Sequence, residues 1–291
     1  MTEQQHVPTF PGRAASERSG RRRVVIVGGG HNGLTAAAYL ARAGAEVTVL
    51  ERLPVLGGAA ISATAFPGLD ARLSRYAYLV SLLPRSIATD LGLHVSLVRR
   101  RYSSYSPVPG TERGLLIDNH DWAATTASFD SVGAGADAER FAAFYRRIER
   151  FAGALFDTVT SPLPTAEQAR GLLSDDWEAF VERPIGEGIE ASVGNDLVRG
   201  VIATDALIGT FTDLHGDTDG NRCLLYHVIG GGTGDWDVPV GGMGVVSGGL
   251  QRAAEAAGAQ LITGAEVTAI DPGGAVTYVV GEQADRLTAD L

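Results

Sequence analysis

Residues 23–51, RVVIVGGGHNGLTAAAYLARAGAEVTVLE, restrict the fold more than any other part of the chain. The β-branched run 24–27 predicts a buried parallel strand, because such a strand is covered on both faces. Three consecutive glycines follow, and residues 34–43 predict an alanine-rich helix that ends at Gly44. Residues 46–51 predict a second strand. The stretch therefore predicts one βαβ unit with a right-handed crossover.

The glycines of this unit follow the pattern GxGxxG, with Gly28, Gly30 and Gly33 between a strand and a helix. The first glycine permits a tight turn, the second lets a pyrophosphate approach the backbone, and the third lets the helix pack close to the strand. The helix N-terminus adds free N–H groups and the positive end of a dipole, so we expect the backbone of His31 and Asn32 to contribute. The pattern predicts a dinucleotide site; the alternative is a glycine-rich turn in an ordinary α/β fold.

Glu51 ends the second strand, where an acidic residue accepts hydrogen bonds from the adenosine ribose hydroxyls. A carboxylate at this position also repels a 2′-phosphate, which disfavours NADP. The motif does not decide between FAD and NAD.

Composition excludes several classes of function. A net charge of -10 argues against a general nucleic-acid binder, which needs a basic face. The sequence contains no lysine, so lysine-based Schiff-base chemistry is excluded within this chain. A single cysteine, Cys223, allows neither a disulfide framework nor a CxxC motif, and we expect it to be a small buried hydrophobe.

We expect no secretory signal and no metal site. Residues 1–22 are polar and predict a disordered tail. No apolar run approaches the ~18 residues that span a bilayer, so the default location is the cytoplasm. Residues 76–84, YAYLVSLLP, leave peripheral membrane contact open, although a buried helix explains them as well. The acidic segment HGDTDGN, residues 215–221, lacks the glycine and glutamate positions of a calcium loop and predicts a surface loop.

The middle of the chain predicts mainly helices. Residues 76–93 look helical around Pro84, and residues 102–118 predict an antiparallel hairpin. Apolar side chains recur at spacings of three and four over residues 138–156, which predicts an amphipathic helix with aromatic residues in the core. Helical character continues to about residue 208, with turns expected at 161–164 and 186–188. A helix over 246–257 and strands QLIT and EVTAI are expected to follow.

The segment that begins at Glu51 resembles a known family. Its sequence ERLPVLGGAA resembles the ExxxxxGG extension of flavoproteins with the glutathione-reductase-type fold. That resemblance implies FAD as the cofactor. It also implies that residues near the pyrophosphate and flavin include Arg52, Gly57, Gly58 and Ala59.

Further segments resemble the phytoene-desaturase-like branch of these flavoproteins: SRYAYLVSLLPRSIATDLGL, RRRYSSYSP, CLLYHVIGGGTGDWDVPVGGMG and TGAEVTAI. The resemblance runs from about Arg23 to Asp271 and implies non-covalently bound FAD. It also implies that the backbone of Val267 lies against the adenine. Members of this branch continue beyond the position that corresponds to Leu291, so we expect a C-terminally truncated chain.

These observations predict an α/β protein: a glutathione-reductase-type FAD/NAD(P)-binding Rossmann-like fold with an inserted α+β substrate domain. The expected parts are a tail (1–22), a first FAD-binding segment (23–100), a substrate domain (101–237) and a second, incomplete FAD-binding segment (238–291).

The expected function is an FAD-dependent oxidoreductase that transfers hydride from a substrate C–H to flavin N5, with an apolar or isoprenoid-like small molecule as substrate. Two alternatives stay open: an NAD-binding Rossmann dehydrogenase, and a non-catalytic nucleotide-binding or regulatory remnant. The sequence identifies no catalytic residue and no oligomeric state. Tyr76, Tyr78 and His227 are the polar residues to inspect, although packing roles explain them better.

Overall fold

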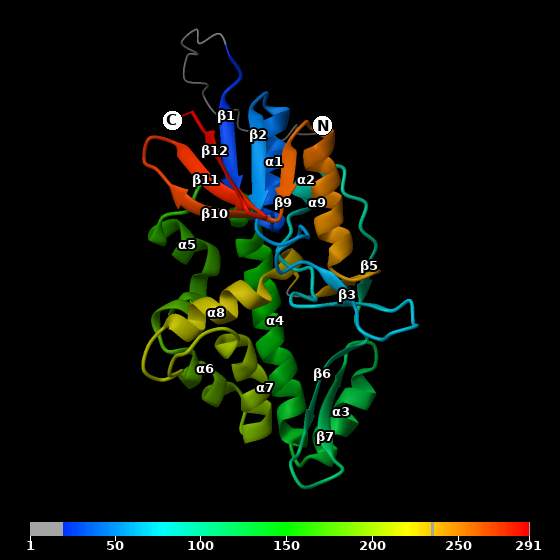
Figure 1. Cartoon of the computed structure of the whole chain (residues 1–291). Helices are drawn as coiled ribbons and strands as arrows, with labels where there is room; N and C mark the ends of the chain where they lie inside the picture. Colours follow the sequence, from blue (N-terminus) through cyan, green and yellow to red (C-terminus); the bar gives the residue numbers. More distant parts are fainter. Residues whose placement is uncertain (1–19, 234–235, 291) are drawn as a thin grey trace, which may run out of the picture. The chain divides into compact units, whose positions relative to one another are not determined.

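The structure is a computed structural model that describes residues 20–233 and 236–290. It divides into two compact units, one formed by the residues up to Leu56 together with those from Ala254 onward, and the other by Gly57–Ala253 (Figure 1). Of the expected tail, residues 1–19 lie outside the described residues. The functional boundaries expected after residues 100 and 237 stay a prediction.

The first unit contains the expected βαβ element. Strand β1 (Arg23–Val27) pairs in parallel with β2 (Glu46–Glu51), and helix α1 (His31–Arg42) connects them. The third strand of this sheet is β9 (Gln260–Thr263), which pairs in parallel with β2 and gives the order β1-β2-β9. The strands predicted from the sequence are confirmed, and the helix begins three residues earlier than expected.

The end of the chain adds a second sheet to this unit. It consists of β10 (Ala265–Ile270), β11 (Ala275–Val280) and β12 (Gln283–Thr288), paired antiparallel in that order. Leu50 of β2 packs in one cluster with Ala265, Val276 and Tyr278 of this sheet. Asp290 then accepts hydrogen bonds from the backbone N–H and the guanidinium of Arg23, at 2.8 and 2.9 Å.

The second unit combines short antiparallel strand pairs with a group of helices. The paired strands are β3 (Ser62–Thr64) with β4 (Arg72–Ser74), β5 (Leu97–Arg99) with β8 (Asp237–Pro239), and β6 (Tyr102–Pro107) with β7 (Gly114–Asp118). The last pair is the expected hairpin. The helices are α2 (Arg85–Asp90), α3 (Trp122–Ser131), α4 (Ala138–Leu155), α5 (Ala166–Leu173), α6 (Ile185–Ser192), α7 (Asp196–Leu207) and α8 (Asp219–Val228). Helix α9 (Gly244–Ala256) begins in this unit.

Helix α4 provides the centre of the core of the second unit. Its residues Phe141, Phe144, Ile148 and Phe151 form one buried stripe, as expected for a helix with aromatic residues in the core. Phe180 packs against this stripe, with its ring centroid 4.5 Å from that of Phe151. Such a stripe buries several large apolar side chains at once, which is the main stabilising contribution of an amphipathic helix.

Two expectations about the middle of the chain were wrong. Only Arg85–Asp90 of residues 76–93 is helical, because Pro84 sets the helix start and Val80 instead exchanges backbone hydrogen bonds with Asp237 at 2.8 and 3.4 Å. The turn expected at residues 186–188 lies within α6. A Cβ at Gly186 would come 2.7 Å from the Leu214 carbonyl oxygen, so this glycine serves close packing rather than a turn.

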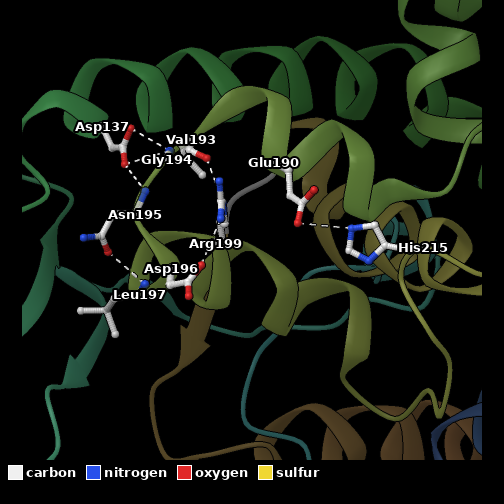
Figure 2. Close-up of polar contacts among 9 residues, drawn as sticks. All are labelled: Asp137, Glu190, Val193, Gly194, Asn195, Asp196, Leu197, Arg199 and His215. Carbon is white, nitrogen blue, oxygen red and sulfur yellow. Dashed lines mark hydrogen bonds and ion pairs between the residues drawn. The ribbon is translucent and has the colours of Figure 1, made fainter.

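A buried carboxylate fixes the start of α7. Asp137 accepts hydrogen bonds from the backbone N–H groups of Gly194 and Asn195, at 3.0 and 2.6 Å (Figure 2). The Asn195 side chain in turn caps α7 by accepting from the Leu197 N–H at 2.9 Å. These contacts satisfy the polar groups of a tight connection, so the cluster has a structural explanation.

Candidate functional site

The glycine turn between β1 and α1 needs glycine for steric reasons. Gly28 adopts a φ of 99°, a region that L side chains rarely enter, and its N–H donates to the Leu50 carbonyl at 2.8 Å. A Cβ at Gly33 would lie 2.1 Å from the Gly28 carbonyl oxygen. The turn therefore brings α1 against β1 as closely as the GxGxxG pattern requires.

Gly29, which lies between the first two glycines of the motif, was not singled out from the sequence. Its N–H donates to the Glu51 carboxylate at 2.7 Å, so the end of β2 holds the turn directly. A Cβ on Gly29 would lie 2.2 Å from the Leu56 side chain and 3.1 Å from that of Glu51. The run of three glycines was the available signal, because the GxGxxG pattern itself does not require a glycine there.

Glu51 has acceptor capacity left after these contacts. One carboxylate oxygen accepts from Gly29 and the other from the Leu53 N–H at 2.8 Å. An ionised carboxylate has about four lone-pair sites. Glu51 can therefore accept two more hydrogen bonds, which matches the two hydroxyls of a ribose.

The N-terminus of α1 is suited to an anion. Gly30 is the N-cap residue, with extended backbone angles; among the described residues no side chain caps this helix, and its first turn contains no acidic residue. His31 and Asn32, in that first turn, are exposed. Uncapped N–H groups and the positive end of the helix dipole favour a phosphate at this position.

The second glycine-rich helix start differs from the first. In VPVGGMG the backbone N–H groups of Met243 and Gly244 donate to the hydroxyls of Ser74 and Ser62, both at 3.0 Å. Side chains of the second unit thus satisfy the start of α9. This glycine segment has a structural role, and α1 remains the better candidate for anion binding.

The remaining cofactor residues expected from the family resemblance are distributed over both units. In the first unit Arg52 is exposed and Val267 is partly buried on β10, opposite Tyr278. In the second unit Gly57 is buried with a φ of 118°, whereas Gly58 and Ala59 are exposed. Their assignment to a cofactor stays a prediction.

The second unit contains a cavity of about 610 Å³ of its own. Its lining is partly apolar, with Ile117, Phe141 and Ile148, and partly polar. Three polar side chains of the lining contact one another: the Tyr145 hydroxyl donates to Asp205 at 2.9 Å, and Nδ1 of His227 lies 3.1 Å from the other carboxylate oxygen of Asp205. His227 was considered from the sequence, whereas Tyr145 and Asp205 were not.

Four other residues considered from the sequence have simple surroundings. Tyr76 is exposed, with the Arg75 guanidinium over its ring, and Tyr78 is half-exposed at the cavity. Cys223 is partly exposed rather than buried, with its thiol 3.2 Å from the Ile208 carbonyl oxygen. The acidic segment was expected to be a surface loop, but its residues 219–221 begin α8; Asp217 accepts hydrogen bonds from the Thr212 hydroxyl and the Asp219 N–H. The described residues contain no group of three or more side chains that could hold a metal ion.

Comparisons with known proteins agree with the geometry of the glycine turn. Residues 26–89 match the family model of the NAD(P)-binding Rossmann-like domain. The chain is 32% identical to the mouse (Mus musculus) pyridine nucleotide-disulfide oxidoreductase domain-containing protein 2 over 296 residues, which cover 88% of this chain and 50% of the mouse protein. The chain is a homologue of that protein. The chain therefore belongs to the family of that protein, while the narrower phytoene-desaturase-like assignment stays a prediction.

A bacterial relative is more similar. An uncharacterised protein of Mycobacterium tuberculosis is 53% identical over 266 residues, which cover 88% of this chain and 50% of that protein. The chain thus spans about half the length of the curated relatives that it matches.

A likeness among solved structures supports the fold. Cyclohexylamine oxidase from Brevibacterium oxydans has a TM-score of 0.53 and 18% identity, and the match covers 92% of this chain and 57% of that enzyme. With the Rossmann-like match, this likeness confirms the expected fold class. None of the described helices is both long and apolar enough to cross a membrane.

Proposed function

We propose that this chain carries the FAD-binding part of an oxidoreductase. The observation that carries the proposal is the Glu51–Gly29 hydrogen bond next to the uncapped N-terminus of α1. The turn Gly28–Gly33 and the first residues of α1, His31 and Asn32, would hold the pyrophosphate, and Glu51 the adenosine ribose. The residues fit the group, because the first turn of α1 offers uncapped backbone N–H groups and Glu51 has acceptor capacity left.

The order of the parallel sheet supports FAD rather than NAD in an ordinary dehydrogenase. Such a dehydrogenase continues with further βαβ units after the second strand. In this chain β2 is followed by the second unit, and the third parallel strand, β9, comes only after it. We extend the proposal to the residues taken from the family resemblance: Arg52, Gly57, Gly58, Ala59 and Val267.

Bound FAD would accept a hydride from a substrate C–H, which is the chemistry that the cofactor supplies. The protein's own contribution is to bind and orient the reactants. We propose the cavity of the second unit as the place of the substrate, which is a mainly apolar small molecule. The side chains of Ile117, Phe141 and Ile148 in its lining support an apolar ligand body. We expect the enzyme to act in the cytoplasm.

The decisive experiment is an absorbance spectrum of the purified chain, followed by mass analysis of what heat releases and by calorimetric titration with FAD and with NAD. Flavin bands with released FAD, or FAD binding alone, support the proposal. Binding of NAD alone would favour an ordinary dehydrogenase. Binding of neither dinucleotide would contradict a cofactor site in this chain.

A pair of glycine variants distinguishes a loss of cofactor binding from a loss of folding. Gly30 has ordinary extended angles, so Gly30→Val leaves the backbone unstrained but fills the space for the pyrophosphate. Gly20→Val is the matched control, because a Cβ there would have no neighbour within 4 Å. We expect Gly30→Val to lose FAD binding with unchanged circular dichroism, and the control to keep it. Retained binding in Gly30→Val would show that the turn is not the site.

A further inference from the structure

The cavity of the second unit contains a polar group built from three helices. Tyr145 comes from α4, Asp205 from α7 and His227 from α8, and all three line the cavity. The side chains of Asp205 and His227 are 10% and 23% exposed. Taking such groups out of water is costly, and apolar residues would fill the same space more favourably. A histidine and a carboxylate at a cavity wall therefore need an explanation besides packing.

The chemistry of these contacts restricts where the protons can lie. Burial, together with the Asp205 carboxylate, raises the pKa of Tyr145 well above its ordinary value, so the phenol keeps its proton and donates it to Asp205. The ionised carboxylate has no proton to give. When Asp205 is ionised and the imidazole is neutral, the proton between Asp205 and His227 lies on Nδ1.

This arrangement leaves Nε2 as the free nitrogen of His227. A neutral imidazole carries one proton, so protonation of Nδ1 makes Nε2 an acceptor. Within residues 20–233 and 236–290 no hydrogen-bond partner of Nε2 exists. The backbone of His227 is held separately, because its carbonyl accepts from the Trp236 indole at 3.1 Å, and the two rings lie 4.5 Å apart.

The wall contains five other charged side chains. Arg99 is paired with Asp237, and Asp118 with Arg101. The Arg100 guanidinium lies over the Trp236 ring, 5.5 Å from its centroid. Arg146 and Glu149 of α4 complete the charged lining.

We propose that Nε2 of His227 binds the hydrogen-bond donor of a ligand in this cavity, a hydroxyl or an amine N–H on a mainly apolar body. Asp205 and Tyr145 are positioning residues that fix the imidazole tautomer. The site deepens the proposed function and, for its role in turnover, rests on it. Oxidation of H–C–X–H to C=X, where X is oxygen or nitrogen, releases one hydride and one proton. Bound FAD would supply the hydride acceptor, Nε2 would take the proton, and Asp205 would stabilise the resulting imidazolium.

The first test measures the tautomer without any turnover, by ¹⁵N NMR of the histidine side chains near neutral pH. We expect His227 to be protonated on Nδ1 and not on Nε2, and Asp205→Asn to shift the proton toward Nε2. His215 is the internal control, because it lies in the same unit and its Nε2 faces Glu190 at 3.5 Å (Figure 2). A wild-type His227 with its proton on Nε2 would overturn the proposal.

The second test uses three probes of similar length: 1-octanol, octylamine and 1-methoxyheptane, of which the ether cannot donate. We expect one or both donors to shift the Nε2 resonance of His227 and the ether to leave it unchanged. The donor that acts identifies the hydroxyl or the amine. We expect His227→Gln to weaken binding of that donor about fivefold, the value of one typical hydrogen bond. His215→Gln should leave it unchanged.

The outcomes separate this proposal from the proposed function. If neither donor shifts Nε2, or the ether shifts it equally, the ligand site at His227 is wrong whether or not the chain binds FAD. If a donor binds at His227 but the chain binds no FAD, the cavity site stands and the proposed function fails.

Discussion

The Glu51 carboxylate accepts a hydrogen bond from the Gly29 backbone N–H at 2.7 Å. This contact joins the end of one strand to the turn that follows its neighbour, so the acidic side chain that we propose for the ribose also shapes the turn. Because both carboxylate oxygens already accept one N–H each, the side chain is held in one orientation before any cofactor binds.

Replacing Glu51 tests that double role. We expect Glu51→Ala to weaken FAD binding by roughly 1–3 kcal/mol, because a charged acceptor is lost. Flavin fluorescence quenching gives the dissociation constant. Glu46→Ala is the control, because Glu46 is exposed at the other end of the same strand. An unchanged dissociation constant in Glu51→Ala would remove this residue from the site.

The third glycine of the motif is expected to be a stability determinant. A Cβ at Gly33 would lie 2.1 Å from a backbone oxygen that cannot move away easily, so Gly33→Ala should cost about 1–3 kcal/mol of unfolding free energy. Gly200→Ala is the matched control in α7, where a Cβ meets nothing within 4 Å. That variant should be about 0.5–1 kcal/mol more stable, because alanine favours a helix. Urea unfolding measures both, and equal stability of the two variants would contradict the close packing.

The local sequence predicted the βαβ unit almost completely. Strand, turn, helix and strand are each determined within a few residues by apolar runs and glycines, and their bounds agree with the structure within three residues. The pairing of β9 with β2 could not be predicted in this way, because all residues of the second unit lie between these two strands in the sequence. Periodicity identifies a strand but contains no information about which distant strand lies beside it.

The same limit explains what was missed at the cavity. Tyr145 and Asp205 are 60 residues apart in the chain, and Asp205 and His227 are 22 apart. Each residue alone looks like an ordinary polar position on a helix. Only the packing of α4, α7 and α8 brings the three side chains together, so no local pattern could have selected them. Residues 76–84 show the opposite error, in which an apolar run looked helical although Pro84 and a backbone pairing with Asp237 keep it extended.

Asp137 is expected to stabilise the second unit without any effect on ligand binding. Its buried carboxylate satisfies two backbone N–H groups at the α6–α7 connection, which Asp137→Ala would leave unpaired (Figure 2). We expect a loss of about 1–3 kcal/mol in unfolding free energy. Asp196→Ala is the control, because Asp196 is exposed at the start of α7. A variant as stable as the control would contradict the role of Asp137 as an anchor of this connection.

Tyr145 should make the stability of the protein depend on alkaline pH. Its folded-state pKa is raised, mainly by burial and then by Asp205, so folding favours the neutral phenol. This contribution is fully present below the unfolded-state pKa of about 10 and is lost as the pH rises toward the folded-state pKa. Tyr145→Phe keeps the ring and removes the titrating group.

We therefore expect two results from urea unfolding of the Tyr145→Phe variant. Near neutral pH, Tyr145→Phe should be about 1–3 kcal/mol less stable than wild type, because Asp205 loses a buried hydrogen-bond donor. Between about pH 9 and 11 the difference should shrink, because wild type loses stability that the variant does not have. Tyr278 has a raised pKa for similar reasons in the first unit, so Tyr278→Phe shows how much of the alkaline loss comes from elsewhere. A difference between wild type and Tyr145→Phe that stays constant through this range would show that the Tyr145 phenol does not titrate as its burial requires.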